Sequence, residues 1–188
     1  MRETAAHTGQ VLQQTLVLVG MPGSGKTAIG RALSARLGAP MKDSDAEIVE
    51  SAQLSIAEIF DRFGEAFFRD REAKVIERLL DGPPCILSTG GGAWLSERNR
   101  EMIGAKAAVL WLEADLDLLW NRVRHKTTRP LLRGPNPKQI LTDLLMARTP
   151  SYELAPMRVH VQSAWSIERT TDEVEAELAR AGVINEAG

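Results

Sequence analysis

The sequence has a single cysteine, no large excess of one charge and no long hydrophobic run. Cys85 is the only cysteine among 188 residues, so no intramolecular disulfide can form, and a reducing compartment fits. The 23 basic and 25 acidic residues leave a net charge of −2, which argues against broad electrostatic binding to nucleic acid or to an anionic membrane. The longest strongly apolar runs, such as AAVLWL at 107–112, are about six residues and too short to cross a membrane. We therefore expect a cytoplasmic protein.

Length and composition predict one globular domain. Apolar residues make up 44% of the chain and charged residues 26%, which is typical of a protein with a hydrophobic core. The first segment, MRETAAHTGQVLQQ, has no long apolar run and carries Glu3, which is untypical of a secretory signal. We expect a flexible N-terminal arm over 1–14, a single domain over 15–182 and a short C-terminal tail over 183–188.

Short apolar runs alternate with helical patterns along the chain. The run TLVLVG is rich in β-branched residues, ends in glycine and predicts a buried parallel strand. After Lys26, apolar residues recur at a spacing of four until Gly38, which is typical of an amphipathic helix. The alternation predicts an α/β fold, a parallel sheet covered by helices on both faces. Strands are expected at 15–20, 39–45, 85–92, 107–112 and 157–161. Further helices are expected at 55–64, 65–82, 96–103, 115–124, 139–155 and 166–182, the one at 139–155 with an interruption near Pro150.

The most specific local motif is GMPGSGKT, which places Gly20-x-x-x-x-Gly25-Lys26-Thr27 between the first strand and the first helix. Glycines let backbone N–H groups point at phosphate oxygens, and the helix adds its positive N-terminal end. Lys26 is expected to reach the terminal phosphates, and Thr27 to offer its hydroxyl to Mg²⁺. The segment therefore predicts a phosphate-binding loop for a nucleoside triphosphate, but it leaves open where the phosphate goes.

An acid for magnesium is missing from the strand where many proteins with this loop carry one, because CILSTGGG (85–92) ends in glycines. The nearest candidates elsewhere are Asp43 and Asp45, at the end of the second predicted strand. Residues two apart on an extended segment point to the same side. One carboxylate can then serve magnesium while the other faces an acceptor hydroxyl. The alternative is that the pair caps the helix beginning near Asp45.

Several arginines are candidates for binding anions. Arg69 lies on a predicted helix in EAFFRDRE, where a solvated helix face is the alternative. Arg129 and Arg133 lie in a proline-rich basic loop at 125–138, and Arg148 precedes TPSY. A basic loop opposite a phosphate loop suits a mobile lid that closes over the transferring phosphoryl group and excludes water. An arginine there offsets the charge on the phosphoryl oxygens.

Three consecutive glycines, Gly90, Gly91 and Gly92, follow the third predicted strand. Open α/β sheets bind ligands at the carboxyl ends of their strands. Glycine at that edge allows a substrate to touch the backbone directly. A plain tight turn is the alternative.

The ordered set GMPGSGKT, DSDAEI, SIAEIF, GEAFFRDRE, STGGGA, RPLL and RTPSY resembles shikimate kinase, over about residues 15–161. The phosphate loop by itself is nonspecific, whereas the ordered set is highly specific. The resemblance implies a three-layer fold with a five-stranded parallel sheet of the nucleoside-monophosphate-kinase type. It also implies transfer of the γ-phosphate of MgATP to the 3-hydroxyl of shikimate, on the pathway to chorismate and the aromatic amino acids.

Site residues follow from the resemblance position by position. Asp43 is implied as the water-mediated magnesium acid beside Thr27, and Asp45 as the base that also binds the shikimate hydroxyls. Arg69 and Arg148 are implied to hold the shikimate carboxylate, and Arg129 to be the lid arginine. The implied catalytic residues are Lys26, Asp45 and Arg129. The implied nucleotide-binding residues are Gly23, Ser24, Gly25, Lys26, Thr27, Ala28, Arg122 and Arg129. The implied acceptor-binding residues are Asp45, Arg69, Gly90, Gly91, Gly92 and Arg148.

The chain departs from the family's pattern at two places. Pro22 stands where the family often has methionine or another apolar residue, which removes one N–H donor and stiffens the loop. The segment VQSAWS at 161–166 lacks an arginine that some members have near the adenine.

Two other functions compete with this interpretation. A kinase for another sugar acid, such as gluconate, would also need an arginine-held carboxylate. A non-catalytic, metabolite-sensing domain would keep the loop but lose the base or the lid arginine, and both are present. We expect a monomeric Mg²⁺-dependent enzyme that binds ATP and shikimate and neither nucleic acid nor membrane.

Overall fold

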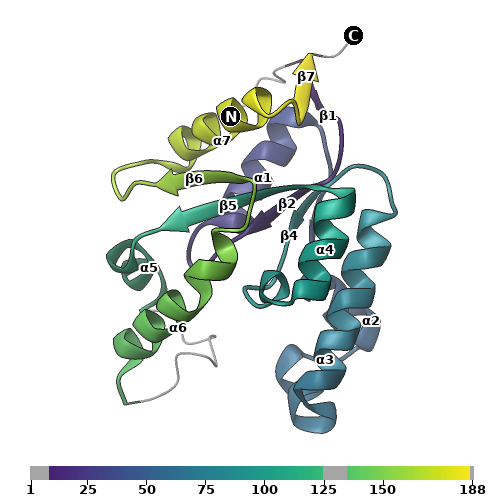
Figure 1. The fold of residues 1–188 in the computed structure, drawn as a ribbon, viewed down its shortest axis with the longest axis vertical. Helices are drawn as coiled ribbons and strands as arrows, with labels where there is room; N and C mark the ends of the chain where they lie inside the picture. The colour runs from purple at the N-terminus through teal and green to yellow at the C-terminus, as the bar shows by residue number, and fades with distance from the viewer. Residues whose placement is uncertain (1–8, 125–134, 187–188) are drawn as a thin grey trace, which may run out of the picture.

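A five-stranded parallel sheet forms the centre of the protein, whose computed structural model describes residues 9–124 and 135–186. Its strands are β2 (Leu16–Val19), β3 (Met41–Asp43), β4 (Ile86–Ser88), β5 (Ala108–Ala114) and β6 (Met157–Val161). They are hydrogen-bonded in the order β3-β4-β2-β5-β6. Helices cover both faces of this sheet, as Figure 1 shows. The predicted three-layer α/β fold with five parallel strands is confirmed.

Seven α-helices and one 3₁₀ turn connect these strands within the described residues. The helices are α1 (Lys26–Leu37), α2 (Ser44–Ala52), α3 (Ile56–Leu80), α4 (Glu97–Lys106), α5 (Leu116–Val123), α6 (Pro137–Tyr152) and α7 (Ile167–Arg180), with the 3₁₀ turn η1 at Ala93–Leu95. Helix α3 begins with a capping box, in which Ser55 accepts from the backbone of Glu58 while the Glu58 side chain accepts from Ser55 N–H. None of the described helices has the length and apolarity that crossing a membrane requires.

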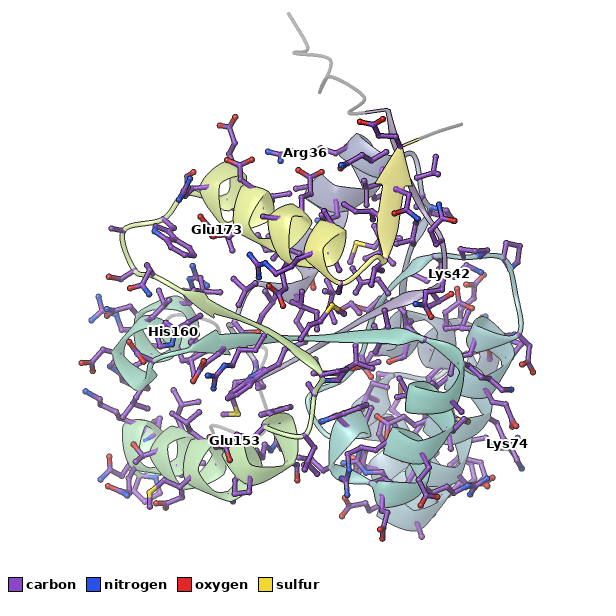
Figure 2. All side chains as sticks on the ribbon, turned by 45° about the horizontal axis from the view of Figure 1, so that its top comes forward. Arg36, Lys42, Lys74, Glu153, His160 and Glu173 are labelled. Carbon is purple, nitrogen blue, oxygen red and sulfur yellow. The ribbon has the colours of Figure 1, made fainter. Side chains whose placement is uncertain are left out.

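Alternate residues of each strand pack into two separate cores. Leu16 and Leu18 of β2 pack against apolar residues of α1 and α7, whereas Val17 and Val19 face the core formed with α3, α4, α5 and α6. This division follows from the period of two in a strand, and it explains why β2 is apolar at every position. On the first side, Arg36 of α1 also bonds to Asp172 and Glu175 of α7; Figure 2 labels it near the surface there.

One predicted helix boundary is confirmed and another is wrong. Element α3 contains both helices expected at 55–64 and 65–82, and the boundary between them lies at Gly64, whose φ of 79° is outside helical geometry. The break expected near Pro150 is absent, because α6 continues through it to Tyr152. A proline removes its own N–H from the helix and its ring crowds the carbonyl four residues earlier, but the last turn of α6 buries Arg148 and Tyr152, and this packing keeps the helix continuous. Pro137 occupies the first position of α6, so the predicted lid, 125–138, overlaps the helix at its end.

The predictions for the two ends of the chain are partly wrong. The arm expected over 1–14 contains a strand, β1 (Gln10–Leu12), and the tail expected over 183–188 contains another, β7 (Ile184–Glu186). These strands pair antiparallel and form a second, two-stranded sheet. Val183 and Ile184 are buried against the core on the α7 side. Strands of three residues carry too few side chains to show a period in the sequence, and only their tertiary contacts stabilise them.

Candidate active site

The phosphate loop connects β2 to the start of α1, as the sequence predicts. Gly25 is the N-cap of α1 and has a φ of 110°, a backbone conformation that favours glycine. Gly23 has no room for a side chain, since a Cβ there would lie 2.7 Å from Cγ1 of Val123 in α5. These two glycines place the backbone N–H groups of the loop at the positive end of α1, where an anion binds favourably.

Polar side chains of the loop surround this helix end. Nζ of Lys26 donates to the carbonyl oxygens of Gly20 and Met21 at 2.8 Å and 3.1 Å, so it lies along the loop. Thr27 is exposed at the start of α1. The hydroxyl of Ser24 is buried and has no hydrogen-bond partner among the described residues. A buried hydroxyl without a partner is costly, which fits a loop that completes its hydrogen bonds on a ligand.

Arg122 of α5 lies against the same loop. Its Nη1 atom donates to the carbonyl oxygens of Gly23 and Ser24 at 3.2 Å and 3.1 Å. Partial burial lowers the pKa of Arg122. The side chain thus reaches the nucleotide loop from the next strand's helix, although its hydrogen bonds here are to protein carbonyls.

Asp43 and Asp45 lie at the junction of β3 and α2, but not on one extended segment. The strand ends at Asp43, which is the N-cap of α2, and Asp45 is already in the first helical turn. Oδ1 of Asp43 accepts from the backbone N–H groups of Asp45 and Ala46 at 3.0 Å and 3.3 Å. Of the pair, only Asp43 caps the helix, while Asp45 points towards Gly90 and the loop that follows β4.

The pKa of Asp45 is raised above its ordinary value. Burial is the largest cause, and the negative charge of Asp43 adds to it, whereas the positive charges of Lys26 and Arg69 lower the pKa. This carboxylate thus interacts electrostatically with both the lysine of the nucleotide loop and Arg69. A carboxylate whose pKa is raised towards neutrality is a better proton acceptor than an ordinary one.

Each of the three glycines after β4 lies against a different charged side chain. A Cβ on Gly90 would lie 2.8 Å from Oδ1 of Asp45, and one on Gly91 would lie 2.9 Å from Nη1 of Arg148. A Cβ on Gly92 would lie 2.7 Å from both Nη1 and Nη2 of Arg69. Any side chain at these positions would displace a charged group, so the glycines bring Asp45, Arg148 and Arg69 around one short loop.

Arg69 is held by acidic residues of its own helix. Nη1 donates to Oε2 of Glu72 at 2.8 Å, and Glu72 is 1% exposed. Burial would lower the pKa of Arg69, but its hydrogen bond to Glu72 and the charges of Glu72 and Glu65 raise it. Burial raises the pKa of Glu72, and Arg69 opposes that rise. The Oε1 atom of Glu72 has no hydrogen-bond partner among the described residues.

Arg148 and Tyr152 hold Gly91 from α6. Nη1 of Arg148 and the hydroxyl of Tyr152 both donate to the carbonyl oxygen of Gly91, at 3.3 Å and 2.8 Å. Within the described part of the chain, the N–H groups of Gly91 and Gly92 make no hydrogen bond. The loop therefore presents two backbone donors beside two arginines, a combination that suits a carboxylate.

Comparisons with known proteins agree with this geometry. A protein-family model described as "Shikimate kinase" matches residues 22–179. A shikimate kinase of Ruegeria pomeroyi is 58% identical over 168 residues, which cover 89% of this chain and 86% of that protein. One of Cereibacter sphaeroides is 54% identical over 158 residues, which cover 84% of this chain and 79% of that protein. The chain belongs to the shikimate kinase family.

A solved structure of the family supports the same conclusion for the fold. The shikimate kinase of Acinetobacter baumannii in complex with shikimate superposes with a TM-score of 0.81 at 35% identity, over 90% of this chain and 94% of that one. The predicted family, fold and class of enzyme are therefore confirmed, and the chain is an ATP-dependent phosphotransferase of the shikimate kinase family.

Most of the residues implied by that family resemblance lie together. The phosphate loop, Asp43, Asp45, Arg69, Arg148 and the three glycines surround the carboxyl ends of β2, β3 and β4. Ala28 follows Thr27 in the first turn of α1. Arg129 and Arg133 lie outside the described residues, so the predicted lid arginine stays a prediction. Trp94, which follows the glycines, is a core residue whose Nε1 donates to Ser151 O at 2.8 Å.

Sequence analysis missed three residues that position this site. Glu72 holds Arg69, Tyr152 holds Gly91, and the hydroxyl of Ser44 accepts from Gly90 N–H at 3.3 Å. Glu72 lies three residues after Arg69, a spacing that brings two side chains together on a helix, so a signal was present. No such local signal links Tyr152 or Ser44 to the glycines, which are far away in the sequence.

Proposed function

We propose that this enzyme transfers the γ-phosphate of MgATP to the 3-hydroxyl of shikimate and releases ADP and shikimate 3-phosphate. The observation that carries the proposal is the arrangement of the three glycines, each packed against Asp45, Arg148 or Arg69, beside a phosphate loop. Such a site offers one carboxylate for hydroxyls and two arginines for a carboxylate. Shikimate, a small polyol carboxylate, has both groups.

The acceptor's carboxylate is expected at the arginines. A guanidinium matches the two oxygens of a carboxylate through paired, charge-assisted hydrogen bonds. Arg69 and Arg148 come from different helices, α3 and α6, and lie against neighbouring residues of one loop, Gly92 and Gly91. Binding at this end directs the hydroxyls of the ring towards Asp45 and the nucleotide loop.

Asp45 is proposed as the general base. The acceptor oxygen forms a bond to the γ-phosphorus while the bond from that phosphorus to the β,γ-bridging oxygen breaks, and ADP leaves with the electron pair. The proton of the attacking hydroxyl passes to the carboxylate of Asp45. Its raised pKa and its position between Lys26 and Arg69 support this role. Lys26 stabilises the charge on the phosphate oxygens during the transfer.

Magnesium fits the oxygen donors beside the loop. The hydroxyl of Thr27 is exposed at the start of α1, and Oδ2 of Asp43 makes no hydrogen bond among the described residues while Oδ1 caps α2. Mg²⁺ binds oxygen ligands, keeps several waters and takes the rest of its ligands from substrate phosphates. Thr27 would hold the ion directly, and Asp43 through water. The ion would neutralise charge on the phosphates of ATP.

An acceptor panel tests the proposal directly. The purified protein is incubated with MgATP and, in separate reactions, shikimate, gluconate or a nucleoside monophosphate, and ADP release is followed. We expect ADP release that depends on shikimate and is absent when magnesium is chelated. ADP release with gluconate alone would support a sugar-acid kinase instead, and no acceptor-dependent release would support a sensing domain. The predicted cytoplasmic location and monomeric state stay predictions.

A further inference from the structure

We propose that Glu65 occupies the edge of Arg69 to which the acceptor's carboxylate binds, so that Glu65 sets the affinity of the site for an anionic acceptor. The inference rests on the proposed function. Under this proposal, Glu65 competes with the acceptor's carboxylate for Arg69 and has to move when the acceptor binds.

All three nitrogen atoms of the Arg69 guanidinium are engaged by carboxylates. Nη1 bonds to Glu72 at 2.8 Å, while Nε and Nη2 both bond to Oε1 of Glu65, at 3.4 Å and 3.3 Å. The Nε and Nη2 atoms form an edge through which a guanidinium binds a carboxylate with two parallel hydrogen bonds. An acceptor carboxylate that uses this edge must therefore displace Glu65.

The two acidic partners differ in how readily they can move. Glu72 is 1% exposed and enclosed, whereas the side chain of Glu65 is 68% exposed and its hydrogen bonds to Arg69 are longer. Swinging Glu65 into solvent breaks only a weak exposed ion pair, because its carboxylate is rehydrated. Displacing Glu72 would leave an unpaired charge in the protein interior. The acceptor's carboxylate therefore displaces Glu65 and not Glu72.

Arg69 keeps its orientation without Glu65. The buried bond to Glu72 fixes Nη1, and the guanidinium lies 5.2 Å from the centre of the Phe68 ring. Gly92 also packs closely against the guanidinium, because a Cβ at this position would lie 2.7 Å from both Nη atoms. Removing the Glu65 charge should leave this arrangement intact and free the Nε and Nη2 edge.

The Glu65–Arg69 pair also borders a cavity of about 470 Å³, which has room for a small organic anion. Gly92 lines the same cavity, together with Ser96 and Asn99 at the start of α4. A ligand can thus approach the pair without any rearrangement of the core. Exposed ion pairs of this kind contribute about 0.2–1 kcal/mol, so their loss on acceptor binding corresponds to about a 1.4- to 5-fold weaker affinity.

The test compares Glu65→Gln and Glu65→Ala with the unmodified full-length protein. Steady-state kinetics at saturating MgATP give kcat and KM for shikimate and, separately, for shikimate methyl ester, which has no carboxylate. Glu173→Gln is the matched control, because Glu173 forms the same kind of exposed i,i+4 pair with Arg169. It lies on α7, on the opposite side of the sheet from α3, as Figures 1 and 2 show.

We expect both Glu65 variants to lower KM for shikimate by about 1.4- to 5-fold, with a smaller change in kcat and none in KM for MgATP. KM for the methyl ester should stay constant, and Glu173→Gln should match the unmodified protein. An unchanged or raised KM for shikimate in both variants would overturn the inference and leave the proposed function standing. No shikimate-dependent ADP from the unmodified protein would instead refute the proposed function, and this inference with it.

Discussion

The hydroxyl of Tyr152 donates a hydrogen bond of 2.8 Å to the carbonyl oxygen of Gly91 and so ties α6 to the glycine loop after β4. Tyr152 is fully buried, and its ring stacks on Trp111 with the ring centres 5.9 Å apart. Because the peptide unit is planar and trans, a Gly91 carbonyl held towards α6 directs the N–H of Gly92 the other way. The buried hydroxyl, together with the longer hydrogen bond from Arg148, thus directs the backbone donor that the loop presents.

Replacing Tyr152 with phenylalanine tests this control, since it removes the hydroxyl and keeps the ring. We expect KM for shikimate to rise about 3- to 10-fold and the free energy of unfolding to fall by about 1–2 kcal/mol, because the Gly91 carbonyl loses its shorter hydrogen bond. Steady-state kinetics and urea unfolding measure the two effects. KM for MgATP should not change; a variant with altered KM for MgATP and normal KM for shikimate would contradict the assignment.

Changing Asp45 to asparagine removes the proposed base while keeping the size of the side chain. We expect kcat to fall by about 10²- to 10⁴-fold, the usual contribution of a general base. Binding of ATP, measured by calorimetry, should persist because the phosphate loop is untouched. Retained turnover in this variant would exclude Asp45 as the proton acceptor.

The raised pKa of Asp45 also predicts two pH dependences. The base must be ionised, so the acid limb of kcat/KM should lie above the ordinary aspartate pKa of about 3.9. A raised folded-state pKa gives stability that is present at low pH and lost as the pH rises through that pKa. Asp45→Asn should therefore melt at a higher temperature than the unmodified protein near pH 7, with a gap that closes towards pH 3.5. A gap that widens at low pH would show the opposite shift.

Two glycine-to-alanine variants separate close contact at the site from a general effect of the substitution. A Cβ at Gly92 would lie 2.7 Å from the Nη atoms of Arg69, whereas one at Gly104, inside α4, would have no described atom within 4 Å apart from its chain neighbours and the backbone of its own helix. Gly92→Ala should raise KM for shikimate and lower kcat/KM by about tenfold or more, since a misplacement of about 1 Å at a positioning group can cost about 100-fold in rate. Gly104→Ala should leave kinetics unchanged and raise stability by about 0.5–1 kcal/mol. Equal kinetics of both variants would contradict the contact.

Arg129 carries a prediction from the sequence alone, because it lies outside the described residues. As the lid arginine, it should stabilise the charge on the transferring phosphoryl group. Changing it to alanine should cut kcat by about 10³-fold, the lower end of what such an arginine contributes. Rapid-quench measurement of phosphoryl transfer would separate this effect from product release. An unchanged transfer rate would place Arg129 outside the site.

Strong local patterns in the sequence were sufficient to predict most of the fold. The run at 15–20 and the glycine loop after it predict β2 and the start of α1, and the predicted last strand matches β6 (Met157–Val161). The small sheet of β1 and β7 was not predicted, because three-residue strands at opposite ends of the chain have no local signal of pairing. The sequence left the conformation of Asp45 open, since DSD is compatible with both a strand end and a helix start, and the structure places it in the first turn of α2.

Some parts of the site could likewise be predicted from the sequence, and others could not. The phosphate loop could be assigned from the sequence because its phosphate-binding groups lie within eight consecutive residues. Its geometry follows from its glycines and from the helix end that comes after it. The order of the motifs determined the family, and with it the residue types that the acceptor site contains. Only the tertiary structure decided which of these side chains touch, because contacts such as Tyr152 with Gly91, or Arg69 with Gly92, join elements that the sequence keeps far apart. Their distances depend on how α3 and α6 pack on the sheet, and that packing is a property of the whole core.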